Sequence, residues 1–134
     1  TVLLTWELCA LHPMTDRDSL TEWFHELAAR THEELLALAS PENVRQLQRH
    51  VARSTPEYPL PSELSASEFA EAVSEFRRNE SAWNRATMAA LIKADEMFKA
   101  DRKEEAAESL EAFAASCPWA LFQEAALNQA THYR

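Results

Sequence analysis

Residues 19–38 read SLTEWFHELAARTHEELLAL, and their apolar side chains recur at the spacing of one helical face. Ser19 and Glu22 stand at the S-x-x-E spacing of a capping box, which satisfies free N–H groups at a helix N-terminus. The pattern predicts a helix over about residues 20–39. The inward-facing positions of this helix are expected to be Leu20, Trp23, Phe24, Leu27, Thr31, Leu35 and Leu38.

Capping residues and periodicity predict further helices on both sides of this segment. Ser40 followed by Pro41 is typical of an N-cap with proline in the first turn, and Ser65 with Glu68 repeats the capping-box spacing. The expected helices cover about residues 2–11, 41–53, 65 to a break or kink at Asn79, 81–99, 103–116 after a turn at Asp101, and 118–131, with a proline-rich connection over 54–64.

The composition is that of one ordinary globular domain, except for one residue type. The chain has 134 residues, 46% of them hydrophobic and 26% charged, and contains no glycine, where average usage would give about nine. A glycine-free chain cannot contain a P-loop, a Rossmann fingerprint or a G-x-S-x-G nucleophile elbow. We therefore predict a single domain over residues 1–134, an all-α, irregular bundle of about five to seven antiparallel helices.

Charge and cysteine content indicate the setting and the kind of partner. The net charge of −9 disfavours duplex nucleic acid and suits a protein partner with a basic or neutral surface. Cys9 and Cys117 make no disulfide framework, so we expect a reducing, cytoplasmic location. The sequence has no apolar run long enough to suggest a membrane span. No cofactor is expected. Residues 1–13, which precede Met14, are interpreted as an extension or fusion remnant. Homo-oligomer formation is left open.

The helical pair over residues 87–120 has small residues where its two helices should cross. Ala94 and Ala106 take these small positions, Leu110 takes a large apolar position, and Pro118 stands near the end. This pattern resembles one tetratricopeptide-type repeat, a helix–turn–helix unit of about 34 residues.

The resemblance departs from the repeat at two positions. Ala90 and Lys93 stand where the repeat has aromatic and leucine side chains. The resemblance implies a protein- or peptide-binding role, with a concave face formed by the first helix of each unit.

Two histidines suggest a metal site. Glu22 and His25 have the Glu-x-x-His spacing of carboxylate-bridged di-iron bundles, and His32 is expected on the same helical stripe. Such a site needs a second Glu-x-x-His motif, which the chain lacks. The alternative interpretation places both histidines on the exposed polar edge of an amphipathic helix.

Cys117 is the candidate reactive thiol. It precedes Pro118 and is expected next to a helix N-terminus, where the helix dipole and free N–H groups lower a thiol pKa. The alternative is a small buried residue that packs between Phe113 and Trp119.

Charged side chains form two stripes that suggest binding surfaces. An arginine stripe suits an anion, RNA or an acidic peptide, and an acidic face suits a basic partner. Either one is also explained as a solvated helix face. The stripes consist of Arg45, Arg49 and Arg53 in one, and Glu104, Glu108 and Glu111 in the other.

These patterns favour a non-enzymatic protein–protein interaction module, a small adaptor or a subunit of a larger assembly. A groove lined by helices 81–99 and 118–131 would support this prediction. The first alternative is an acidic neutralising protein, such as an immunity protein or inhibitor, that binds a basic target. The second is a metal- or thiol-dependent enzyme that uses His25, His32 or Cys117.

Overall fold

The computed structural model describes the backbone of residues 16–134 and the side chains from residue 19 onward. This part of the chain forms six α-helices and no strands, so the all-helical prediction is confirmed. The helix expected over residues 2–11 lies outside the described residues. The helices are α2 Asp16–Ala28, α3 His32–Ala37, α4 Pro41–Ser54, α5 Ala66–Lys99, α6 Lys103–Ser116 and α7 Ala120–Tyr133.

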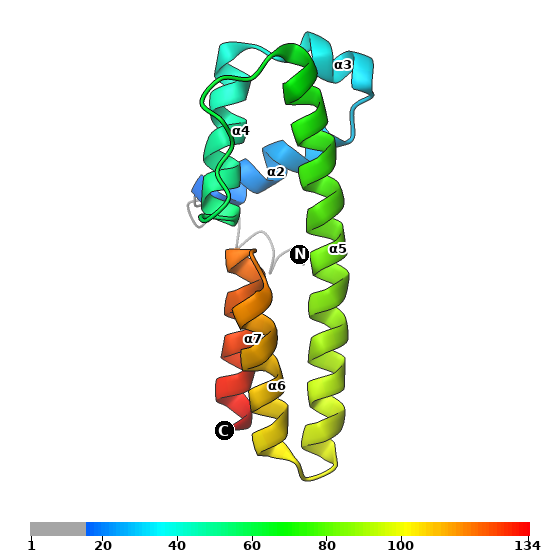
Figure 1. Cartoon of the computed structure of the whole chain (residues 1–134). Coiled ribbons are helices and arrows are strands. Elements are labelled where there is room, and N and C mark those ends of the chain that lie inside the picture. Colours follow the sequence, from blue (N-terminus) through cyan, green and yellow to red (C-terminus); the bar gives the residue numbers. More distant parts are fainter. Residues whose placement is uncertain (1–15) are drawn as a thin grey trace, which may run out of the picture.

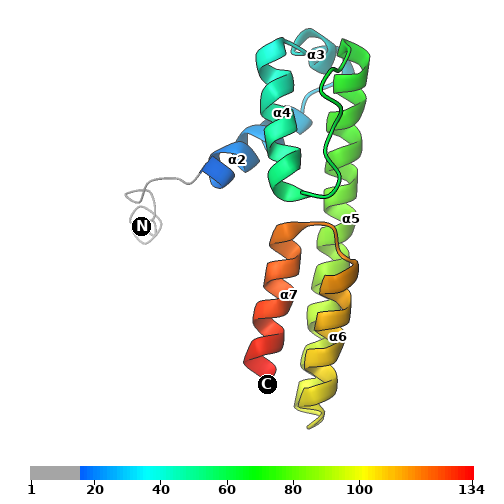
Figure 2. The same ribbon diagram turned by 60° about the vertical axis from the view of Figure 1, so that its left-hand side comes forward.

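The longest helix, α5, organises the molecule. Its 34 residues extend over roughly 50 Å. Figure 1 shows α2, α3 and α4 beside the N-terminal half of α5, and α6 and α7 beside its C-terminal half; Figure 2 shows the same division from another side. No helix in the described residues is both long and apolar enough to cross a membrane.

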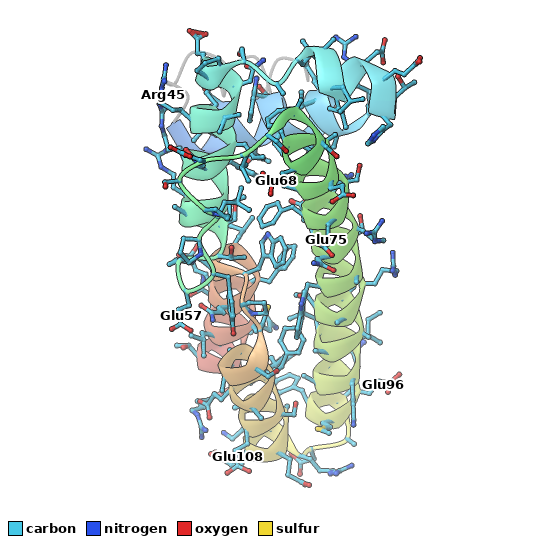
Figure 3. The ribbon with its side chains drawn as sticks, turned by 45° about the horizontal axis from the view of Figure 1, so that its top comes forward. Arg45, Glu57, Glu68, Glu75, Glu96 and Glu108 are labelled. Atoms are coloured by element: carbon cyan, nitrogen blue, oxygen red, sulfur yellow. The ribbon has the colours of Figure 1, made fainter. Side chains whose placement is uncertain are left out.

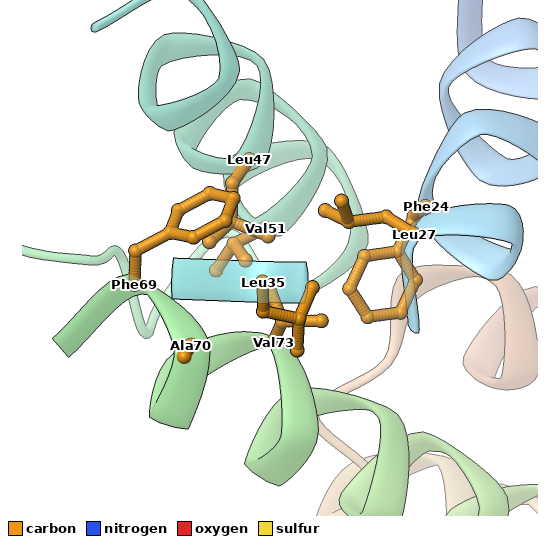
Figure 4. Close-up of a cluster of buried hydrophobic side chains, with 8 residues drawn as sticks. All are labelled: Phe24, Leu27, Leu35, Leu47, Val51, Phe69, Ala70 and Val73. Carbon is orange, nitrogen blue, oxygen red and sulfur yellow. The ribbon is translucent and has the colours of Figure 1, made fainter. Parts of the chain in front are cut away.

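The N-terminal half has a core of aliphatic and phenylalanine side chains. In Figure 4, side chains from α2, α3, α4 and α5 point toward one another. Burying each large side chain of this kind contributes about 1.5–3 kcal/mol. The fully packed residues of this cluster are Phe24, Leu27, Leu35, Leu47, Val51, Phe69, Ala70 and Val73.

The C-terminal half has a second core, which is rich in alanine. Small side chains let α5, α6 and α7 approach one another closely, because interaxial distance depends on the residues at the contact. The buried residues here are Ala94, Ala106, Ala107, Leu110, Ala114, Ala126, Ala130 and Tyr133.

Aromatic rings extend from the first core to the start of α7. Phe76, on α5, packs against the first cluster, and its ring centroid lies 5.5 Å from that of Phe24. On its other side it lies 4.7 Å from Trp119, in the loop before α7. Trp119 in turn stacks on Phe122 of α7, with centroids 6.2 Å apart. Side chains therefore fill the space between the halves, as Figure 3 shows.

The connection between α4 and α5 was predicted from its prolines. Residues 55–65 are not helical, and the side-chain amide of Gln48 donates a hydrogen bond to the carbonyl of Pro61 at 2.7 Å. Figure 1 shows this connection returning along α4, so α4 and α5 run parallel while α5, α6 and α7 alternate in direction. The pair α4 and α5 is thus an exception to the expected antiparallel packing.

The predicted helix over residues 20–39 is two helices. The Thr31 side chain accepts a hydrogen bond from the N–H of Glu34, and the Glu34 carboxylate accepts one from the N–H of Thr31. This capping box begins α3 and turns Thr31 outward, although we expected it to face inward. Ser19 lies inside α2 and is not its N-cap, because α2 already begins at Asp16.

Asn79 does not interrupt α5. The helix continues from Ala66 to Lys99, and the predicted capping box of Ser65 and Glu68 begins it. Asparagine costs only a few tenths of a kcal/mol more than average in a helix interior. The predicted break was therefore wrong, because a weak helix former does not end a helix that is packed at both ends.

The connections before and after α6 follow from backbone conformation. Asp101 forms the predicted turn with φ of 66°, in the left-handed region that aspartate tolerates better than most residues. Cys117 is extended and ends α6, as a residue before proline prefers. α7 begins at Ala120, with Trp119 as N-cap, and not at Pro118 as predicted.

Candidate functional site

Two hollows lie along the seam between α5 and α7, and together we call them the α5–α7 groove. A groove between these two helices is the feature that would support the predicted interaction module. Its C-terminal part is a hollow of about 470 Å³, bounded by Ile92, Asp95 and Glu96 on α5 and by Gln129 and Tyr133 on α7. Its other part is a hollow of about 460 Å³ near the start of α7. That hollow is lined by Thr21, His25, Arg77, Glu80, Ser81, Asn84, Arg85, Leu121 and Phe122.

Large apolar side chains are exposed along this seam. Met88 and Ile92 on α5 are 52% and 57% exposed, and Leu121 on α7 is 50% exposed. Met88 and Ile92 stand four residues apart, so they are neighbours on one helix face. Single exposed hydrophobic residues are common, but a row of them beside a groove is typical of an interaction surface.

The C-terminal end of the groove has a fixed polar wall. The ammonium of Lys99 lies 3.0 Å from the Asp95 carboxylate, and its hydrogen bond lowers the pKa of that carboxyl. The Tyr133 hydroxyl donates a hydrogen bond to Asp95 at 3.3 Å, while its ring stacks on Phe98 at 4.6 Å. Glu96 stays exposed beside this wall.

The other end of the groove carries an ion-pair network that joins α2 to α5. His25 Nε2 lies 3.1 Å from the Glu80 carboxylate, and Arg77 donates a hydrogen bond to the same oxygen at 2.7 Å. Glu80 is therefore satisfied from two sides. Arg85 is exposed at the rim and forms no ion pair with the described residues.

The predicted stripe of His25 and His32 is wrong. His25 belongs to α2 and pairs with Glu80, whereas His32 begins α3, beyond the break at Thr31. Glu22 remains exposed on α2. Among the residues with described side chains, no group of three histidines, cysteines or carboxylates is placed to hold a metal ion.

His50, the residue after Arg49 on α4, is a buried histidine. It is 3% exposed and stacks on Phe24 at 4.7 Å, with the Phe76 ring edge-on at 5.7 Å. Burial lowers its pKa to about 4; the Glu80 charge opposes this shift and His25 adds to it. Its position three residues after Leu47 could have shown that it faces inward.

Cys117 is a buried packing residue, as the alternative interpretation predicted. Its Sγ lies 3.9 Å from the carbonyl oxygen of Trp119, and burial raises the pKa of the thiol. The expected lowering of this pKa was wrong in direction, because Cys117 ends α6 and α7 begins only at Ala120.

Cys117 should therefore react slowly with thiol reagents. In a Cys9→Ala variant, where Cys117 is the remaining thiol, we expect disulfide exchange at neutral pH to be at least about 100-fold slower than for a free cysteine, since reaction requires local opening. The rate of disulfide exchange with a chromogenic reagent measures this, with the urea-unfolded protein as the fast control. A native rate near that of free cysteine would contradict the buried position.

The charged stripes remain at the surface. Arg45 and Arg49 are exposed on α4, as is Arg53, and Figure 3 shows Arg45 pointing outward. On the acidic face, Arg134 donates hydrogen bonds to Glu104 and Glu111. Two of the three carboxylates in the predicted acidic face therefore already contact a cation within the chain.

The chain matches no protein-family model, no curated protein and no solved structure. The tetratricopeptide-like pair over residues 87–120 therefore stays a prediction. Its two small positions, Ala94 and Ala106, lie buried in the second core, and the turn at Asp101 lies between them.

Proposed function

We propose that this protein is a non-enzymatic protein–protein interaction module that binds an amphipathic helix of its partner in the α5–α7 groove. The observation that carries the proposal is the exposure of Ile92 and Leu121, which line the two hollows, with Met88 exposed one turn before Ile92 on α5. Helix-in-groove recognition uses apolar anchors of this kind, spaced at i, i+3, i+4 and i+7 on the bound helix.

The charges on either side of Met88 and Ile92 define the partner further. Arg85 stands before these two residues and Glu96 after them, roughly 16 Å apart along α5. A complementary helix of about three turns would carry an acidic residue near Arg85 and a basic residue near Glu96. Such rim charges set orientation and speed association more than they add affinity.

The contacts give less support to the other candidate functions. A neutralising protein would use its acidic face, but Glu104 and Glu111 already contact Arg134. A thiol-dependent enzyme would need an accessible thiolate, but Cys117 is buried and its pKa is raised. A metal enzyme would need clustered ligands, and His25 and His32 lie on different helices.

The variant Ile92→Glu tests the groove. An unpaired carboxylate facing an apolar partner surface costs roughly 2 kcal/mol or more, so partner affinity should fall at least about 30-fold. Leu127→Glu is the matched control. Leu127, on α7, is an exposed aliphatic residue like Ile92, but it does not line either hollow.

The measurement has two steps. Proteins captured from the source organism by wild type and by Leu127→Glu, but lost with Ile92→Glu, are the candidates. A synthetic peptide with i, i+4, i+7 apolar spacing from such a protein should then bind in fluorescence anisotropy with the same ranking of variants. Equal peptide binding by Ile92→Glu and wild type would rule out this groove.

A further inference from the structure

We infer that the helix bound at this groove is α5 of a second copy of the chain, paired antiparallel along its exposed face. The inference rests on the proposed function and names its partner. It comes from the order of side chains on α5, where Met88 and Ile92 lie between Arg85 on one side and Glu96 on the other.

In an antiparallel pair this order complements itself. When Met88 of one copy lies on Ile92 of the other, twofold symmetry places Ile92 of the first on Met88 of the second. The same register brings Arg85 of each copy beside Asp95 and Glu96 of the other. Exposed Ala89, on the same face, has a small side chain that lets the two helices approach closely.

A parallel pair of α5 helices has the opposite outcome. It would place Arg85 beside Arg85 and Glu96 beside Glu96, and like charges that face each other repel. The charge order on this face thus selects the antiparallel arrangement. The apolar contact at its centre is small, so we expect a weak dimer that forms with rising concentration.

Charge reversal tests the register. Arg85→Glu alone and Glu96→Arg alone each make both contacts between position 85 and position 96 repulsive in a homodimer, so each should weaken dimerisation about tenfold or more. In an equimolar mixture of the two variants, both contacts between positions 85 and 96 of unlike copies are attractive again. The mixture should therefore dimerise within about threefold of wild type.

Sedimentation velocity from low-micromolar to near-millimolar concentration measures these species, at low salt because exposed ion pairs are screened. Arg45→Glu is the matched control. It makes the same charge change as Arg85→Glu at an exposed position on α4, and it should leave dimerisation unchanged. Circular dichroism checks that each variant is folded; both substituted side chains on α5 are exposed, so folding should persist.

Two results would overturn the inference. One is a wild-type protein that stays monomeric at every concentration, and the other is a dimer that the mixture fails to restore. Neither result removes the proposed function, which is judged separately by whether Ile92→Glu abolishes binding of a partner-derived peptide. If Ile92→Glu abolishes the dimer and no peptide from another protein binds the groove, the second copy of the chain is the principal partner.

Discussion

Replacing Trp119 with alanine should lower the free energy of unfolding by about 3–5 kcal/mol, the usual cost of removing a buried aromatic side chain. Trp119 is 5% exposed, and its ring centroid lies 4.7 Å from that of Phe76 in a tilted contact; Phe76 in turn packs against the first core. The substitution therefore leaves a cavity where the two halves of the molecule meet. Urea denaturation followed by far-UV circular dichroism measures the change.

Trp119→Phe is the matched control. The indole Nε1 is buried and has no hydrogen-bond acceptor among the described residues, so a phenyl ring keeps the stacking and removes an unsatisfied donor. We expect the stability of this variant to lie within about 1 kcal/mol of wild type. If Trp119→Phe were as unstable as Trp119→Ala, the indole N–H would have a partner that the structure lacks.

Stability should also fall in mildly acidic solution because of His50. The unfolded chain binds a proton on this side chain near its ordinary pKa of 6.5, whereas in the folded protein the pKa is lowered to about 4. Between these values the unfolded chain binds more protons, so unfolding becomes more favourable as pH falls. The full contribution is present above about pH 6.5, and as much as about 3 kcal/mol is lost by pH 4.

Thermal unfolding at a series of pH values measures this loss, which should lower the midpoint by roughly 10 °C between pH 7 and pH 4. In His50→Phe the ring between Phe24 and Phe76 is kept but cannot titrate, so the decline over this window should be much shallower. Glu105 and Glu111, whose pKa values are lowered by Arg102 and Arg134, titrate in both proteins and cancel in the comparison. An identical decline in both proteins would show that His50 is not its source.

Local patterns predicted most of the helices. Ser40 with Pro41 and the capping box of Ser65 and Glu68 begin helices where expected, because these signals act through hydrogen bonds within a few residues. Thr31 and Glu34 carry the same kind of signal, but the apolar spacing continues through it and therefore predicts one helix where there are two. Asn79 does not end α5, because helix propensity is weak compared with packing at both ends of the helix.

The candidate site could be predicted only in outline. The sequence indicated only that a groove between helices near 81–99 and 118–131 would support an interaction module, and the exposure of Met88 and Ile92 depends on how α5 is rotated about its axis in the bundle. The pairing of His25 with Glu80 joins residues far apart in sequence. Periodicity describes one helix at a time, so it does not predict which residues of different helices contact each other.

The continuity of α5 has a consequence for how the chain can change in length. This helix has its first half in one core and its second half in the other, so its length and rotation fix the position of one core relative to the other. An inserted residue near its middle would turn everything beyond it by about 100° and shift it by about 1.5 Å. Both cores could not then stay packed together, so this segment should accept insertions or deletions only in near-whole helical turns. The non-helical connection over 55–65 is free of that restriction.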